Sequence, residues 1–167
     1  MKRFVCLFLV LIFLFTLCSC GISGNIKDEG TFYYRRSDFL YGKDSSVMAA
    51  ETKDITGHAD DLSYLVALYL LGPTEKALVS PFPRNAKLLS AQMDGQSIMI
   101  ELSDMGRLMT DAEFSLACAC LTLTCLDLTD GTQVTVTSAD RSITMTQDTL
   151  LLYDGDSSTE TIAEESK

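Results

Sequence analysis

The sequence predicts an α+β domain with two helices packed on one face of a mostly antiparallel sheet. Three observations lead to this prediction. Two segments repeat apolar residues at helical spacing, shorter segments alternate apolar and polar residues, and turn-forming pairs such as Asp94-Gly95 separate them. The expected order of elements is β-β-α-β-β-α-β-β. The 167 residues suffice for a single domain, which we place at residues 30–153.

Two strands are expected before the first helix. Residues 30–41 are rich in Phe and Tyr, which favour strands, and the segment is expected to bend near Ser37-Asp38. Residues 47–55 are a weaker and more polar strand candidate. The turn between the two strands is expected at residues 42–44.

The first helix is expected over residues 58–71, because its apolar side chains recur at three- and four-residue steps. Gly72 can take a left-handed cap and Pro73 cannot continue the helix, so the pair should end it. The next segment, residues 74–85, is expected to be irregular, since two prolines hold its centre extended.

A β-hairpin is expected around Asp94-Gly95, which is a strong short-range turn signal. Its strands are residues 87–93 and 97–102. Every other residue of the second strand is apolar, so one face of it should be buried, formed by Ile98, Ile100 and Leu102.

The second helix is expected to begin at the capping box of Thr110 and Glu113 and to run to about Asp127. Its apolar stripe comprises Phe114, Cys118, Leu121 and Cys125. Two strands should follow, at residues 134–138 and 143–146, with residues 150–152 as a candidate edge segment. The acidic residues 154–167 are too poor in apolar side chains to fold, and we expect a disordered tail there.

The N-terminal end is predicted to be a signal peptide, residues 1–19, followed by a tether, residues 20–29. Two basic residues precede an uncharged apolar run over residues 4–17. As a helix this run would span roughly 21 Å, which is short of the ~30 Å hydrocarbon core of a membrane. The alternative is a short anchor helix that stays uncut.

Cys20 is the predicted lipidation site. Leu17-Cys18-Ser19-Cys20 resembles the bacterial lipobox, which consists of an aliphatic, a variable and a small residue followed by Cys. The Cys20 thiolate would take a diacylglycerol, with a further acyl chain such as palmitate in the triacylated form. Two or more chains suffice for stable anchoring. We therefore expect a lipoprotein held at the outer face of the bacterial cytoplasmic membrane.

The charge of the mature chain argues against a nucleic-acid partner. The whole chain has a net charge of −10 and is 47% hydrophobic. Without residues 1–19, the remaining 148 residues carry 11 basic and 23 acidic side chains, a net charge of −12. Phosphate binding needs clustered Lys and Arg.

The three cysteines of the predicted domain are expected to pack in its core, above all Cys118 and Cys125. On one helix these two would be about 10 Å apart along the axis, too far for a disulfide. Cys118 and Cys120 would point to opposite sides of the helix. The spacing of the three residues is not that of a zinc site and a fourth ligand is missing. We therefore predict no metal and no cofactor.

The sequence shows no catalytic constellation, so we expect no enzyme. His58 is the only histidine. Beside Asp60 and Asp61 it is a metal candidate, but a solvated turn at a helix start is the favoured interpretation. Glu101 and Asp104 flank a strand end on an outward face, which favours solvated carboxylates over a glycosidase pair.

Four motifs follow one another between Leu62 and Met145. They are the helix end Leu70-Leu71-Gly72-Pro73, the loop Ser80-Pro81-Phe82-Pro83, the hairpin with Leu88-Leu89-Ser90-Ala91 and Met99-Ile100-Glu101-Leu102-Ser103, and the helical segment Leu121-Thr122-Leu123-Thr124. Together they resemble the GerMN domain, also called the sporulation and spore germination domain. The last hairpin lacks a glycine that is usual in this family, and the best-known member has two copies of the domain where this chain has one.

The resemblance implies a fold similar to that of ring-building modules of secretion-like assemblies. It also implies binding or scaffolding without catalysis, with other envelope proteins as partners. Whether the chain forms a homo-oligomer is left open.

Two functions therefore remain. The first is a lipid-anchored interaction or scaffold module in sporulation, spore germination or envelope assembly. The second is a small-ligand or cell-wall-binding lipoprotein, in which residues 80–84 form the rim of a pocket. A hydrolase is the least favoured interpretation.

Overall fold

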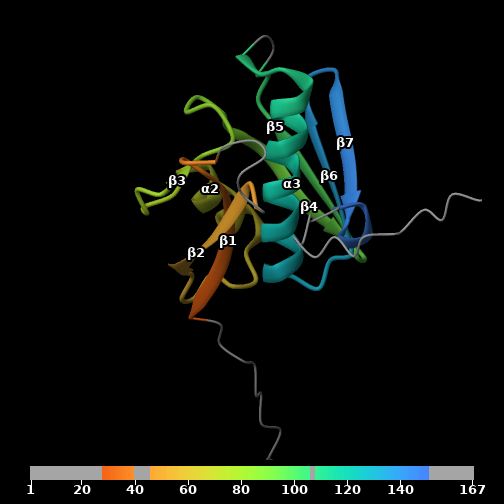
Figure 1. Cartoon of the computed structure of the whole chain (residues 1–167). Helices are drawn as coiled ribbons and strands as arrows, with labels where there is room; N and C mark the ends of the chain where they lie inside the picture. Colours follow the sequence, from red (N-terminus) through yellow and green to blue (C-terminus); the bar gives the residue numbers. More distant parts are fainter. Residues whose placement is uncertain (1–27, 40–45, 106–107, 151–167) are drawn as a thin grey trace, which may run out of the picture.

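The computed structural model describes residues 28–39, 46–105 and 108–150, which form two sheets and two helices (Figure 1). The three-stranded sheet has the order β2-β1-β3 and consists of β1 (Glu29–Arg36), β2 (Met48–Asp54) and β3 (Leu78–Val79). The four-stranded sheet consists of β4 (Leu88–Asp94), β5 (Ser97–Leu102), β6 (Gln133–Ser138) and β7 (Arg141–Thr146), in that order. The helices are α2 (Leu62–Leu70) and α3 (Asp111–Leu128), and the 3-10 helix η2 (Gln147–Thr149) follows β7.

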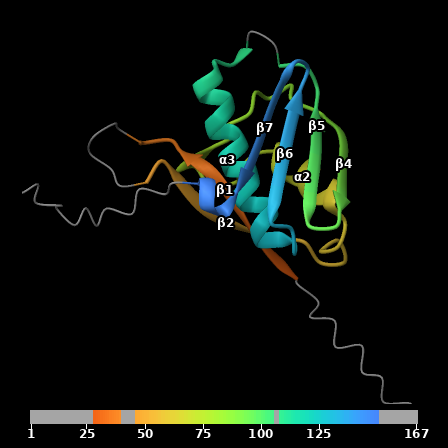
Figure 2. The same ribbon diagram turned by 90° about the vertical axis from the view of Figure 1, so that its right-hand side faces the viewer.

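The α+β class is confirmed, but the strands form two sheets where one was expected. The helix α3 lies between them, with β1 against one side and β6 and β7 against the other. Figure 2 looks onto the four-stranded sheet with α3 behind it. Residues on several sides of α3 are buried, including Cys120 and Thr124 as well as the predicted stripe. A helix buried on opposite sides needs a layer on each side, so the first strands form a sheet of their own.

The first sheet packs on α3 through β1, in which every second residue from Gly30 to Tyr34 is buried. Gly30, Phe32 and Tyr34 are its buried residues. A Cβ at Gly30 would lie 2.5 Å from Cδ2 of Leu128, so β1 approaches the end of α3 as closely as a glycine permits. The segment that was expected to be irregular contains the two-residue β3, which pairs with the end of β1.

The helix α2 begins at Leu62, later than predicted, because Asp61 is its N-cap. The Asp61 carboxylate accepts a hydrogen bond from the Tyr64 backbone N–H at 3.0 Å. The residues from His58 to Asp61 form a turn instead, since the Asp61 N–H donates to the His58 carbonyl at 3.0 Å. As predicted, Gly72 follows the helix end, with a φ of +88°.

The second sheet agrees closely with its sequence pattern. β4 and β5 form the expected antiparallel hairpin, and Ile98, Ile100 and Leu102 are buried. The Gly95 φ of +60° supplies the turn. β5 and β6 are parallel, since the chain crosses over through α3 between them, and β6 and β7 are antiparallel. The capping box that starts α3 is present as predicted.

Several predictions concern residues outside the described part of the chain. These are the signal peptide, the lipidation of Cys20, most of the tether, the turn at residues 42–44, most of the candidate edge segment at residues 150–152 and the acidic tail from Asp154 onward. Within the described residues, neither helix combines the length and the apolar composition that crossing a membrane requires.

Candidate functional site

The loop Ser80-Pro81-Phe82-Pro83 is anchored at its centre and exposes its flanks. Phe82 is buried, and its ring packs in a T-shaped arrangement with the ring of Tyr69, with the ring centroids 6.2 Å apart. The Ser80 hydroxyl donates to the Phe82 carbonyl at 3.1 Å, which closes the loop upon itself. Pro81 and Pro83 are only partly covered and line a cleft on the surface of the domain.

This cleft, which we call the loop–helix cleft, has a volume of about 660 Å³. The segment around the end of β1 and the start of β2 contributes Arg35, Phe39 and Val47. The start of α3 and the residues just before it contribute Leu108, Met109, Ala112, Glu113 and Leu116. Of residues 80–84, which were predicted to form the rim of a pocket, Ser80 to Pro83 line this cleft. The contributions of the segment between β1 and β2 and of the start of α3 were not predicted from the sequence.

The charged groups of the loop–helix cleft are Arg35 and Glu113. The Oε2 atom of Glu113 accepts hydrogen bonds from the Thr110 backbone N–H at 2.8 Å and from the Thr110 hydroxyl at 2.9 Å. These bonds, and then the positive charge of Arg35, lower the pKa of the Glu113 carboxyl. The carboxylate is thus ionised and held in place by the helix start.

Arg35 is differently placed. The alternation of β1 leaves its side chain exposed, and its backbone pairs with Val79 of β3. Among the described residues, its guanidinium makes no side-chain hydrogen bond and no ion pair. The group can therefore donate to a bound molecule.

The three cysteines of α3 are packing groups, as predicted. Cys118, Cys120 and Cys125 are free thiols and all are buried. Burial raises the pKa of each thiol to about 12, so the reactive thiolate is disfavoured. Cys120 was expected to point away from Cys118, and it does so into the second buried side of the helix.

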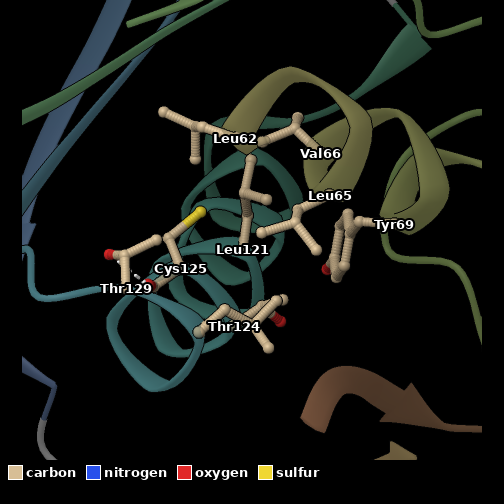
Figure 3. A pocket seen from close by; sticks show the side chains of 9 residues that line it. Leu62, Leu65, Val66, Tyr69, Leu121, Thr124, Cys125 and Thr129 are labelled. Atoms are coloured by element: carbon tan, nitrogen blue, oxygen red, sulfur yellow. Dashed lines mark hydrogen bonds between the residues drawn. The ribbon is translucent and has the colours of Figure 1, made fainter. Parts of the chain in front are cut away.

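A second hollow lies between α2 and α3, but it is too small to hold a water molecule (Figure 3). Figure 3 shows Leu65, Val66 and Tyr69 of α2 facing Leu121 and Cys125 of α3. The Tyr69 hydroxyl is buried without a hydrogen-bond partner in the described part of the chain. This contact joins the two helices and is not a ligand site.

The other sequence candidates lie apart from the loop–helix cleft. His58 is exposed, and its ring stacks on Tyr64 with the centroids 3.9 Å apart. Asp61 caps α2, and Glu101 accepts a hydrogen bond from the Ser90 hydroxyl on the outward face of the second sheet. Over residues 28–39, 46–105 and 108–150, His, Cys, Asp and Glu nowhere form a group of three that could hold a metal ion.

In sequence comparisons, the chain matches no protein-family profile and no curated protein. In structure comparisons, the tandem GerMN domains of the sporulation protein GerM from Bacillus subtilis match with a TM-score of 0.51 and 19% sequence identity. The match covers 68% of this chain and 39% of that one. A protein from Clostridium perfringens that is proposed to be a lipoprotein matches with a TM-score of 0.45 and 18% identity, over 72% of this chain and 87% of that one.

The likeness to the tandem domains shows that the described residues have a GerMN-like fold. The sequence motifs between Leu62 and Met145 pointed to this fold, and the structure comparison confirms it.

Proposed function

We propose that the chain is a lipid-anchored interaction module at the outer face of a bacterial cytoplasmic membrane. The GerMN-like fold is the observation that carries this proposal, because one of the solved structures that share it is a sporulation protein. The process that we propose is therefore sporulation, spore germination or another step of envelope assembly. The lipobox that ends at Cys20 supports the attachment to the membrane.

The attachment is tested by fractionating cells that produce the chain or its Cys20→Ala variant. We expect the unaltered chain in the membrane fraction and the variant in the fraction released from it. Equal membrane binding of both would contradict lipidation at Cys20 and would favour the uncut anchor helix.

The role in the envelope is tested by deleting the gene and counting heat-resistant spores, together with crosslinking of the chain in intact sporulating cells. We expect fewer spores or slower germination, and a crosslinked envelope protein. Normal sporulation and germination without any crosslinked protein would contradict the proposal.

A small-ligand or cell-wall-binding lipoprotein is the second candidate. It is favoured by the loop–helix cleft, because about 660 Å³ lies in the range of roughly 300–1,000 Å³ that small-molecule sites occupy. A rise in melting temperature with muropeptides or sugars at low concentration would support it. We propose no catalysis in either case, since the cysteines are buried and Glu113 is the one carboxylate among the described residues that line the loop–helix cleft.

A further inference from the structure

We propose that the loop–helix cleft binds an extended, mostly apolar peptide segment of a partner protein, with the backbone of the segment held between Arg35 and Glu113. This inference rests on the proposed function, because it names the site of that interaction module and the chemistry of its partner.

The charges of the cleft fit a peptide backbone better than an ion. A peptide carries carbonyl oxygens, which accept hydrogen bonds, and N–H groups, which donate them. Arg35 supplies only donors and the Glu113 carboxylate only acceptors, so the two side chains complement the two kinds of backbone group. A bound anion would be attracted by Arg35 but repelled by Glu113.

The remaining lining fits apolar side chains. Phe39 and Val47 come from the segment between β1 and β2, Leu108 and Leu116 come from the start of α3, and the loop adds two prolines. Leu108 lines the cleft and is 60% exposed, although it is a large apolar residue. Covering it would remove apolar surface from water, which favours binding.

The openness of the cleft favours a peptide over a small ligand, since a small ligand is usually enclosed by its site. Four of its twelve lining residues are exposed, namely Arg35, Leu108, Ala112 and Glu113. Small-molecule sites bury most of the surface of their ligand, at least roughly 70% of it. An open cleft with polar groups on both walls suits a chain that lies across it.

The test selects peptides from a random linear library displayed on phage, with the full chain in detergent micelles as bait. A selected peptide is then labelled with fluorescein, and its affinity for variants of the chain is measured by fluorescence anisotropy. We expect Arg35→Gln to weaken binding about ten- to a hundredfold, as the loss of a charge-assisted hydrogen bond does. The matched control Arg84→Gln should leave the affinity unchanged, since Arg84 is exposed next to the loop but does not line the cleft.

A second pair of variants tests the apolar wall. Leu108→Ser should weaken binding about three- to tenfold. Leu89→Ser should not, although Leu89 is also 60% exposed, because it lies on β4 away from the cleft. Both residues are at the surface, so both variants are expected to fold, which melting curves check.

Failure to enrich any peptide would overturn the inference, as would a selected peptide that binds Arg35→Gln as tightly as the unaltered chain. Binding of a muropeptide that depends on Arg35, without any selected peptide, would assign the cleft to the second candidate function. If an envelope protein is still crosslinked in cells and neither Arg35→Gln nor Leu108→Ser weakens that crosslink, only the cleft is refuted and the proposed function stands.

Discussion

The two ends of α3 lie in opposite environments. Toward its C-terminal end, Leu121 and Cys125 are closed in by α2 and both sheets, and we call this part of the helix the closed end. Near its start, Glu113 and Leu116 line the loop–helix cleft, and we call this part the open end. The course of β1 explains the difference. The strand passes close to Leu128 at Gly30, bonds to Thr124 at Tyr33 and ends soon after Arg35, before it covers the first turns of α3. The helix therefore contributes to the core along its whole length, through Phe114 and Ala117 near its start as well, but only near its start does it also line the candidate binding cleft.

The largest expected effect concerns the reactivity of the closed end. Alkylation of Cys118, Cys120 and Cys125 in the folded chain should be slower than in denaturant by a factor of about a thousand or more, because the thiols react only after unfolding. Mass spectrometry of the peptide that contains them measures the rate. Labelling as fast in buffer as in denaturant would show that this end of α3 is open.

The same burial predicts how stability depends on alkaline pH. The folded thiols have a pKa raised to about 12 from the ordinary value of 9.0, so the unfolded chain loses these protons first. Their contribution to stability is complete below about pH 9. The free energy of unfolding should therefore fall as the pH rises from 9 toward 12. Replacing all three cysteines by alanine should flatten this decline, and an unchanged slope would contradict the assignment.

Truncation of side chains should also separate the two ends of α3. Leu121→Ala should reduce the free energy of unfolding by about 2–5 kcal/mol, because Leu121 is fully buried between the helices. Leu108→Ala at the cleft should change it by less than about 0.5 kcal/mol, since Leu108 is exposed. Urea unfolding measures both, and similar losses would erase the proposed distinction.

Two buried threonines of the closed end offer a sharper comparison. The Thr124 hydroxyl accepts a hydrogen bond from the Tyr33 backbone N–H at 2.9 Å and donates to the Cys120 carbonyl. Thr124→Val leaves that N–H of β1 without a partner and should cost about 1–3 kcal/mol.

The Thr122 hydroxyl is buried too, but it has no hydrogen-bond partner within the described residues. Thr122→Val should therefore be neutral or stabilising, since it removes an unsatisfied polar group. The two variants are compared by urea unfolding. A larger loss for Thr122→Val than for Thr124→Val would contradict the assigned hydrogen bond.

The smallest effects are expected at the open end. Thr110→Ala removes the N-cap of α3 and should cost about 1 kcal/mol. Glu113→Gln should change stability by less than about 0.5 kcal/mol, because Gln also completes a capping box. Thermal unfolding measures both. A strong loss for Glu113→Gln would mean that its charge stabilises the fold and is not available to a ligand.

Local signals in the sequence predicted most of the elements. The Thr110 capping box, the Gly95 turn and the alternation of Ile98 and Ile100 depend on neighbours in the chain, and all three appear in the structure. The start of α2 was misplaced because residues 58–61 were counted as part of the helix, whereas the Asp61 side chain caps it and the helix begins at Leu62. The short β3 has no signal of its own, since it exists only through its pairing with β1.

Contacts between distant segments were not predictable from the sequence in this way. Cys120 and Thr124 lie off the predicted stripe of α3, and their burial indicates a second covering layer only once β1 is seen against them. The loop–helix cleft was foreseen from the prolines of one wall alone. Arg35 and Leu108 come from segments whose meeting depends on how both sheets pack around α3, and neither position has a local pattern that marks it.

The chain is proposed to be an interaction module whose binding site lies at the open end of α3. Photocrosslinking in living cells is the most direct test of this proposal. A photoreactive phenylalanine analogue takes the place of Leu108 in the full chain, and in a matched variant it takes the place of Leu89, which is equally exposed. We expect one discrete crosslinked envelope protein from position 108 and none from position 89. A crosslink from position 89 alone, or none from either position, would contradict the assignment of function to the loop–helix cleft.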